Sequence, residues 1–201
     1  MKKTFRYILF YKPYGVLSSF TDPGGRETLL PYIDIKDVYA AGRLDYDSEG
    51  LLLLTNDGRL IQRITDPRFH LPKTYWVQVE GLIHLQALEK LKQGVDIPGY
   101  HTQPCQARLI AEPALAPRSK PITPHAPPSW IELTLREGKK RQVRHMTAAV
   151  GFPTLRLIRA AIGPLLLEGL EAGQWRELTD SEEKALLLSA FQNRPQKNSG
   201  R

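Results

Sequence analysis

A short acidic loop holds the residues of this sequence that are best suited to chemistry. It runs from 42 to 50, contains Arg43 and Asp45, and leads directly into four leucines at 51–54. A carboxylate at the rim of an apolar strand can act as a nucleophile or a general base. It then needs a nearby cation, because burial otherwise raises its pKa. The alternative is a surface turn in which Asp side chains bind the nearby backbone, and spacing alone favours this alternative.

The same loop also permits a metal-binding interpretation. Asp45, Asp47, Glu49 and Gly50 match the first half of a calcium-binding EF-hand loop. The twelfth position of that motif requires a bidentate glutamate, and here it is Asn56. The intervening residues are leucines suited to a strand, so the sequence predicts no calcium site of this kind.

A run of basic residues at 136–145 is the second candidate. On a helix, Lys140 would lie beside Arg144, and Arg141 beside His145, next to an apolar stripe. Such a helix can lay cations along a phosphate backbone while one of them points inward. A solvated basic face is the ordinary alternative. The segment has almost no acidic residue to balance its charge, which favours a surface for an anionic ligand.

A tyrosine near the start of a strand is the third candidate. Tyr75 belongs to an alternating segment at 73–80, with Val77 and Val79 on the same face. Its ring could stack on a nucleobase, and its hydroxyl could form a hydrogen bond with that base. Taken alone, a tyrosine is more often a residue of the core or its rim.

These residues need a framework, and the hydrophobic pattern predicts interleaved strands and helices. We expect strands at 5–10, 51–54, 73–80 and 130–135. We expect helices at 60–64, 85–91, 139–150 and 181–191. The proline-rich stretch at 112–128 is typical of a long exposed loop. Because the elements show no regular βαβ rhythm, the predicted class is α+β.

Composition limits the classes of protein to which the chain can belong. It has 201 residues, 41% of them hydrophobic, and 28 Lys and Arg against 21 Asp and Glu give a formal net charge of +7. This charge favours a polyanionic partner, nucleic acid before an acidic membrane surface. The single cysteine, Cys105, allows no intrachain disulfide and no cysteine zinc site. The sequence shows no signal-peptide core and no membrane-length apolar segment, which predicts a cytoplasmic protein.

Ordered motifs along most of the chain carry a family resemblance. They are Lys-Pro-Tyr-Gly-Val at 12–16, Gly-Arg-Leu-Asp at 42–45, the run 50–58, Lys-Thr-Tyr at 73–75, the run 138–146, Leu-Ile-Arg at 157–159 and Ile-Gly at 162–163. Together they resemble the pseudouridine synthases, in the branch that modifies single uridines of ribosomal RNA. The resemblance implies isomerisation of a flipped-out uridine to pseudouridine. It is closest to the members that act on the large subunit, which implies 23S rRNA as the substrate.

The resemblance also implies a role for each matching residue. Asp45 matches the essential aspartate, the expected nucleophile, and Tyr75 matches the tyrosine that stacks on the target base. Arg144 matches the basic residue that pairs with this aspartate and keeps it ionised. Arg43 matches the arginine that contacts RNA beside the flipped nucleotide. The other expected substrate-binding residues are Lys73, Lys140, Arg141 and Gln142.

The implied fold is a long mixed, mostly antiparallel β-sheet with flanking helices and a central RNA-binding cleft. We expect one catalytic domain at 1–192, a basic disordered tail at 193–201 and no separate N-terminal RNA-binding domain. Family members use no cofactor and no metal, so none is expected. The expected partner is 23S rRNA or an assembly intermediate of the large subunit. The protein is expected to be a monomer that binds no membrane.

Two other classes of protein remain open on the sequence. A non-catalytic rRNA-binding or ribosome-assembly protein would use the basic segment equally well but would not need Asp45. A metal-dependent nuclease could use Asp45, Asp47 and Glu49, and it would require magnesium. The classes differ in their product, because isomerisation leaves the mass of the RNA unchanged whereas a nuclease cleaves it.

Overall fold

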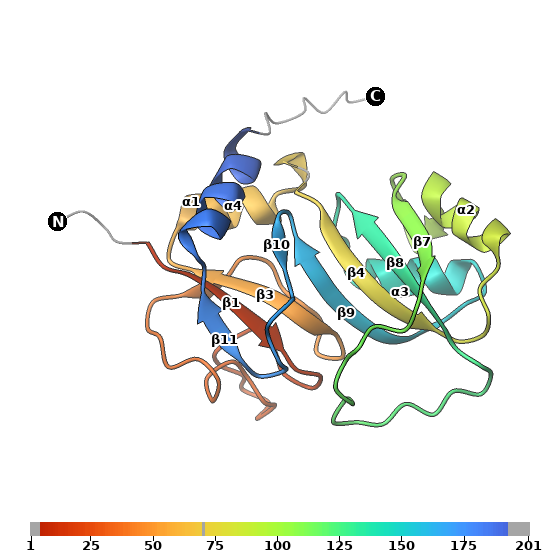
Figure 1. Cartoon of the computed structure of the whole chain (residues 1–201), viewed down its shortest axis with the longest axis horizontal. Coiled ribbons are helices and arrows are strands. Elements are labelled where there is room, and N and C mark those ends of the chain that lie inside the picture. Colours follow the sequence, from red (N-terminus) through yellow and green to blue (C-terminus); the bar gives the residue numbers. More distant parts are fainter. Residues whose placement is uncertain (1–4, 70, 193–201) are drawn as a thin grey trace.

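The centre of the protein is a mixed β-sheet whose strands follow the order β11-β1-β3-β9-β4-β8-β7 (Figure 1). A computed structural model describes residues 5–69 and 71–192, and the predicted tail at 193–201 lies outside them. Short strands β2 and β10 pair with β3 and β9. The strands of this sheet are β1 (Tyr7–Lys12), β2 (Tyr39–Ala40), β3 (Glu49–Thr55), β4 (Lys73–Val79), β7 (Gln106–Ile110), β8 (Ser129–Leu135), β9 (Thr154–Ile162), β10 (Leu165–Leu166) and β11 (Trp175–Glu177).

Helices pack against the sheet, and a small hairpin lies outside it. The helices are α1 (Gly58–Thr65), α2 (Leu85–Gln93), α3 (Gln142–Ala149) and α4 (Asp180–Gln192), with a 3-10 turn η1 (Pro67–Phe69) after α1. The hairpin pairs β5 (Asp96–Ile97) with β6 (Tyr100–His101). Within the described residues, only β3 and β9 pair in parallel. This arrangement confirms the predicted α+β class and the mixed, mostly antiparallel sheet.

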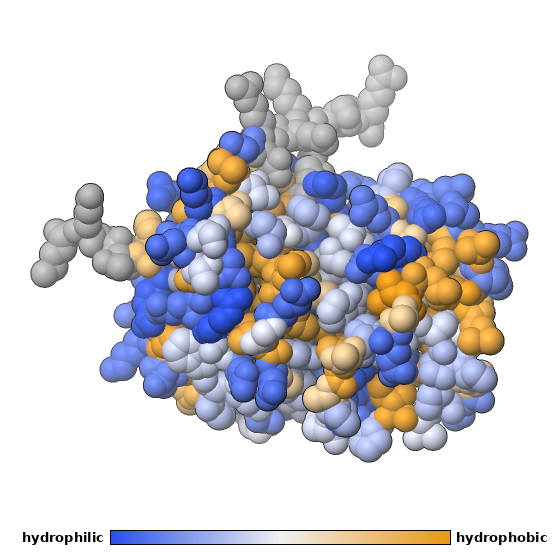
Figure 2. Space-filling view, viewed as in Figure 1, coloured by the Kyte–Doolittle hydropathy of each residue, from blue (hydrophilic) through white to orange (hydrophobic). Residues whose placement is uncertain are grey.

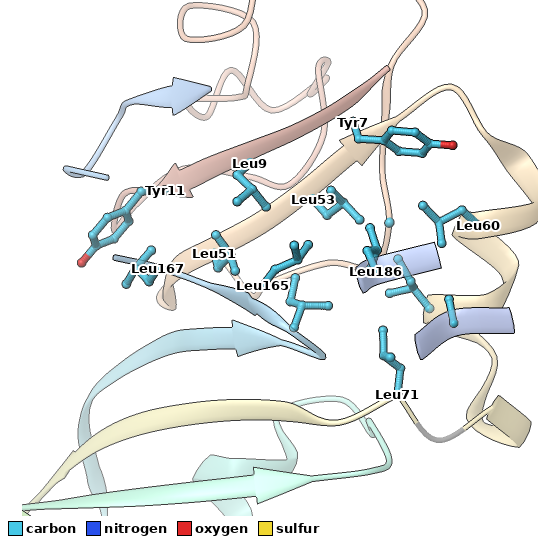
Figure 3. Close-up of a cluster of buried hydrophobic side chains, with 14 of the residues drawn as sticks. Tyr7, Leu9, Tyr11, Leu51, Leu53, Leu60, Leu71, Leu165, Leu167 and Leu186 are labelled. Atoms are coloured by element: carbon cyan, nitrogen blue, oxygen red, sulfur yellow. The ribbon is translucent and has the colours of Figure 1, made fainter. Parts of the chain in front are cut away.

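The leucine run forms a strand that is buried on both faces. Leu51 and Leu53 face a core shared with α1 and α4 (Figure 3). Leu52 and Leu54 face a second core that includes residues from the segment 16–38. Burial on both faces explains the continuous apolar run, and each buried leucine contributes roughly 2 kcal/mol. The acidic loop therefore leads into one of the most firmly held strands of the protein.

Gly50 allows β3 and β9 to lie close together. It pairs with Arg159 in the parallel ladder and has a φ of +105°. A Cβ atom at this position would lie 2.5 Å from the backbone oxygen of Arg159 and 2.6 Å from its nitrogen. Only glycine fits such an approach. The pairing fixes the first residues of β3 beside the residues of β9 that line the site.

The ends of two helices follow the sequence signals. The Asp57 carboxylate accepts hydrogen bonds from the backbone nitrogens of Arg59 and Leu60, which confirms it as the N-cap of α1. Thr179 and Glu182 form the predicted capping box of α4. The Thr179 nitrogen donates to the Glu182 carboxylate at 2.9 Å, and the Glu182 nitrogen donates to the Thr179 hydroxyl at 3.3 Å.

Two features of the fold differ from the sequence prediction. The predicted helix at 139–150 begins only at Gln142, because Arg141 adopts a left-handed conformation with a φ of +55°. Leu85 at the start of α2 is 77% exposed, and the buried residues of this helix are Ala87, Leu88 and Leu91. Leu85 of α2 and Leu109 of β7 are exposed apolar residues, and Figure 2 shows an apolar surface over these two elements. The sequence analysis also missed the central strand β9.

The proline-rich loop at 112–128 contains no helix or strand, as predicted, and other segments hold it in place. The Ala116 carbonyl accepts a hydrogen bond from Arg156 at 3.1 Å, and the Ala126 nitrogen donates to the Glu80 carboxylate. In Figure 1 the loop (green) runs along the lower edge of the sheet. It is therefore an exposed loop with a fixed course. No helix within residues 5–69 or 71–192 is long and apolar enough to span a membrane.

Candidate active site

A cleft of about 570 Å³ opens between the acidic loop and the segment that precedes α3. Residues of the acidic loop line one part of it, residues 135–143 line another, and β4 and β9 contribute further side chains. The cleft gathers all the predicted site residues except Arg144: these are Arg43, Asp45, Lys73, Tyr75, Lys140, Arg141 and Gln142. Segments far apart in the sequence thus bring the predicted residues to one place.

Asp45 lies in a tight turn and is half-buried. Its backbone oxygen accepts a hydrogen bond from the Ser48 nitrogen at 3.1 Å. The preceding residue, Leu44, is held on both sides by the Ser18 hydroxyl, which accepts from its nitrogen at 3.0 Å and donates to its oxygen at 2.9 Å. Within the described part of the chain, the Asp45 carboxylate forms no hydrogen bond and no ion pair. The turn is fixed, and its carboxylate is available to a ligand.

The expected ion pair between Arg144 and Asp45 is corrected by the structure. Arg144 contacts Asp47 instead, with a hydrogen bond to its backbone oxygen at 2.7 Å and an ion pair to its carboxylate at 3.4 Å. Arg141 binds both carboxylate oxygens of Asp47, each at 2.9 Å. Burial alone would raise the pKa of Asp47, but the hydrogen bond and the charges of these arginines lower it. Asp47 therefore holds two cations near Asp45.

Arg144 and Arg141 differ in their exposure. The Arg144 side chain is 13% exposed, and burial lowers the pKa of its guanidinium. Its Nε atom is buried without a hydrogen-bond partner in the described residues. Arg141 is 38% exposed and reaches the cleft. The charge of Asp45 acts on both arginines and favours their charged forms.

A buried layer beneath the acidic loop is also charged. Arg156 forms two hydrogen bonds with the Glu49 carboxylate, at 2.9 and 2.8 Å, and both residues are buried. Lys12 is fully buried and donates to the carbonyls of Pro13 at 2.9 Å and Val16 at 2.7 Å. Burial lowers the pKa of Lys12 to about 7, although the charge of Glu49 opposes this shift. The pair of Arg156 and Glu49 fixes the start of β3, and the bonds of Lys12 fix the turn that follows β1.

Tyr75 lies opposite a buried cation that the sequence analysis did not single out. Tyr75 of β4 pairs with Arg159 of β9, at a point where the register of the ladder shifts. The Arg159 Nε atom donates to the Leu51 oxygen at 2.7 Å, while its Nη2 atom has no hydrogen-bond partner among the described residues. Burial lowers the pKa of Arg159, and the nearby Tyr75 hydroxyl opposes that effect. Arg159 lines the cleft and belongs to the Leu-Ile-Arg motif, which could have identified it.

The remaining predicted substrate-binding residues have unequal access to the cleft. Arg43 and Lys140 are exposed at its rim. Lys73 is half-buried, and its ammonium donates to the carbonyls of Ile64 at 3.1 Å and Leu71 at 3.3 Å. Burial lowers the pKa of Lys73 to about 8. Lys73 therefore lines the cleft, while its ammonium is bound to the backbone at the end of α1 and in the loop that follows.

Gln142 serves the shape of the loop before α3. It is only 3% exposed, donates to the Glu137 carboxylate and accepts from the Lys139 nitrogen at 2.9 Å. These contacts argue against a direct contact with RNA. They also support the left-handed turn at Arg141, which directs its guanidinium to Asp47.

Comparison with known proteins gives the class of this fold and site. Residues 6–149 match the sequence profile of a family described as RNA pseudouridylate synthase. The chain belongs to this family, which makes it an isomerase that acts on RNA.

Individual relatives and a solved structure refine this placement. A ribosomal large subunit pseudouridine synthase E from Vibrio parahaemolyticus is 51% identical over 175 residues, which cover 86% of this chain and 74% of the relative. A ribosomal small subunit pseudouridine synthase A from Vibrio cholerae is 37% identical over 182 residues, covering 88% and 72%. A crystal structure of a pseudouridylate synthase superimposes with a TM-score of 0.78 at 31% identity, covering 91% of this chain and 74% of that one.

Proposed function

We propose that this chain converts a uridine of large-subunit ribosomal RNA to pseudouridine, with Asp45 as the essential carboxylate. One observation supports this role of Asp45. Its carboxylate has no protein partner in the described residues, and it lines the cleft together with cationic side chains. The higher identity to a large-subunit enzyme than to the small-subunit enzyme supports the choice of RNA.

The reaction is a rearrangement in which every atom is retained. The bond between N1 of uracil and C1′ of the ribose breaks, and a bond between C5 of uracil and C1′ forms. C5 loses a proton and N1 gains one, so the RNA keeps its mass. Asp45 supplies a carboxylate as nucleophile or base, and Tyr75 lies in the same cleft to hold the uracil ring.

The target uridine has to leave its stack before it can reach Asp45. Extruding a base costs a few kcal/mol. Arg43, Lys140 and Arg141 at the cleft can offset this cost by binding the flanking phosphates. Arg144 keeps the loop in shape through Asp47, and the buried Arg159 guanidinium lies next to Tyr75 at the wall of the cleft.

We also propose a monomer that acts in the cytoplasm without a membrane or a cofactor. Residues from 40 to 159 of a single chain line the cleft, which supports one catalytic unit within the predicted domain at 1–192. Two carboxylates of the nuclease alternative, Asp47 and Glu49, already bind arginines. No group of three His, Cys, Asp or Glu side chains in residues 5–69 and 71–192 is placed to hold a metal ion.

The test is to incubate the protein with large-subunit ribosomal RNA in excess chelator. The RNA is then treated with carbodiimide and analysed by primer extension, and the masses of its fragments are measured by mass spectrometry. A new carbodiimide-reactive uridine with unchanged mass supports the proposal. Cleaved RNA would indicate a nuclease, and bound but unmodified RNA would indicate a non-catalytic binding protein.

A further inference from the structure

Three side chains in or beside the acidic loop have no role in the site described above. They are Tyr14, Tyr46 and Arg118, and we call them the aromatic platform. Tyr46 follows Asp45 directly and is 41% exposed. The Arg118 guanidinium lies over the Tyr14 ring, 4.2 Å from its centroid. The platform thus joins two rings and a cation from three segments of the chain.

Hydrogen bonds fix these segments relative to one another. The Gly15 backbone nitrogen donates to the backbone oxygen of Tyr46 at 2.9 Å. The Tyr46 ring lies along Gly15, where an added Cβ would be 3.7 Å from its hydroxyl oxygen. Arg118 donates through Nε to the Lys120 oxygen at 2.6 Å and through Nη1 to the Leu155 oxygen at 3.5 Å. The backbone that carries the two tyrosines and the Arg118 side chain are therefore held before any ligand arrives.

The aromatic platform lies outside the residues that line the cleft, and it adjoins the arginines that bind Asp47. Burial lowers the pKa of Arg144, and the charge of Arg118 adds to that effect, which places Arg118 near the arginines that bind Asp47. Tyr46 lies between Asp45 and Asp47 in the sequence. Its side chain forms no hydrogen bond and no ring contact with the residues that the structure describes. A large, exposed ring with no such partner stands next to the expected nucleophile.

We propose that the aromatic platform binds the nucleotide adjacent to the target uridine, with the base stacked on Tyr46 and its phosphate near Arg118. This inference rests on the proposed function. When a uridine is extruded, its neighbour loses a stacking partner, and a protein ring can replace that partner. The Arg118 guanidinium, which lies over the Tyr14 ring, would contact the phosphate of the same nucleotide. The ligand is single-stranded RNA, and the recognition tolerates different bases because every base has a π-face.

The test compares Tyr46→Ala with Tyr46→Phe on a ribosomal RNA fragment that the wild-type protein modifies. Stacking predicts that Tyr46→Ala weakens RNA binding roughly 5- to 150-fold, whereas Tyr46→Phe stays close to wild type. Tyr39→Ala is the matched control, because Tyr39 is an exposed tyrosine, 61% exposed, that lies in β2 and not in the acidic loop. Wild-type binding by Tyr46→Ala, or equal losses in both Tyr46 variants, would overturn the proposal.

The contribution of Arg118 is measured by the salt dependence of binding. Arg118→Ala should reduce the slope of log Kd against log salt by about 1. Arg108→Ala, which removes an exposed arginine paired with Glu132, should leave the slope unchanged. An unchanged slope for Arg118→Ala would contradict the phosphate contact. If the wild-type protein forms no pseudouridine on any ribosomal RNA, the proposed function fails, and that result is distinct from a failure of the platform alone.

Discussion

The Arg144 guanidinium donates a hydrogen bond to the backbone oxygen of Asp47, two residues beyond Asp45. Arg141 binds the Asp47 carboxylate from the same side of the cleft. The two carboxylates therefore have different tasks: Asp47 anchors the cations, and Asp45 stays unpaired in their field. A direct pair with Asp45 would stabilise the carboxylate but would also occupy the oxygens that have to react.

Asp47→Asn should lower activity without unfolding the protein. The amide keeps the size of the side chain but loses the charge that binds Arg141 and Arg144. Arg141 would then lose both of its ionic hydrogen bonds and could move toward Asp45, while Arg144 would keep only its bond to the Asp47 backbone oxygen. We expect kcat/KM for pseudouridine formation to fall roughly 10- to 100-fold, since small misplacements at a reacting centre have effects of this order.

Glu89→Gln is the matched control for this substitution. It removes the same charge from an exposed ion pair with Lys92 on α2, and Glu89 does not line the cleft. It should leave kcat/KM within twofold of wild type. Equal activity of Asp47→Asn and Glu89→Gln would show that anchoring by Asp47 is not needed.

Gly50→Ala should destabilise the protein strongly. The new methyl group would meet the backbone of Arg159 at 2.5 Å and would also require an unfavourable φ of +105°. Left-handed backbone costs about 1–2 kcal/mol, and the clash should add roughly 1–3 kcal/mol. Chemical denaturation of the purified variant measures the sum.

Gly99→Ala isolates the backbone contribution to this loss. Gly99 also has a positive φ, +72°, but nothing lies within 4 Å of the position of its Cβ. Its free energy of unfolding should fall by only about 1–2 kcal/mol. If both variants lose the same amount, the close approach of β3 and β9 is less restrictive than the structure indicates.

Lys12 should make stability depend on pH. Burial lowers its pKa from 10.5 to about 7, so between these values the unfolded chain holds a proton that the folded protein does not. Unfolding then takes up a proton, and stability rises with pH across this window. Relative to Lys12→Met, wild type should gain up to roughly 3–4 kcal/mol between pH 7 and pH 10. Denaturation curves of both proteins at several pH values measure the difference, and parallel pH profiles would contradict it.

Local sequence signals predicted several elements because those elements depend on local interactions. The Asp57 cap and the Thr179–Glu182 box are satisfied by the backbone of their own helices. The strand β9 was missed because Arg156 and Arg159 interrupt its apolar pattern. Both arginines are buried, and they are neutralised or hydrogen-bonded by β3, more than a hundred residues away in the sequence. Their environment is a property of the tertiary fold.

The residues of the candidate site could likewise be predicted from the sequence, whereas their ion pairs could not. Asp45, Tyr75 and the basic segment stand out through their motifs, and the cleft brings Asp45 and Tyr75 together. The partner of Arg144 could not be predicted, because Asp45 and Asp47 are only two residues apart and sequence spacing cannot choose between them. The left-handed turn at Arg141 decides the outcome, and it depends on the buried Gln142 and its contact with Glu137.

The most direct test of the account is pseudouridine formation by Asp45→Asn. The variant and the wild-type protein are incubated with the same ribosomal RNA, and pseudouridine is measured by carbodiimide primer extension, with RNA affinity and unfolding free energy measured in parallel. We predict a fall in rate of at least roughly 100-fold, with affinity and stability close to wild type. Formation of pseudouridine at the wild-type rate would contradict the central claim that the unpaired Asp45 carboxylate performs the chemistry.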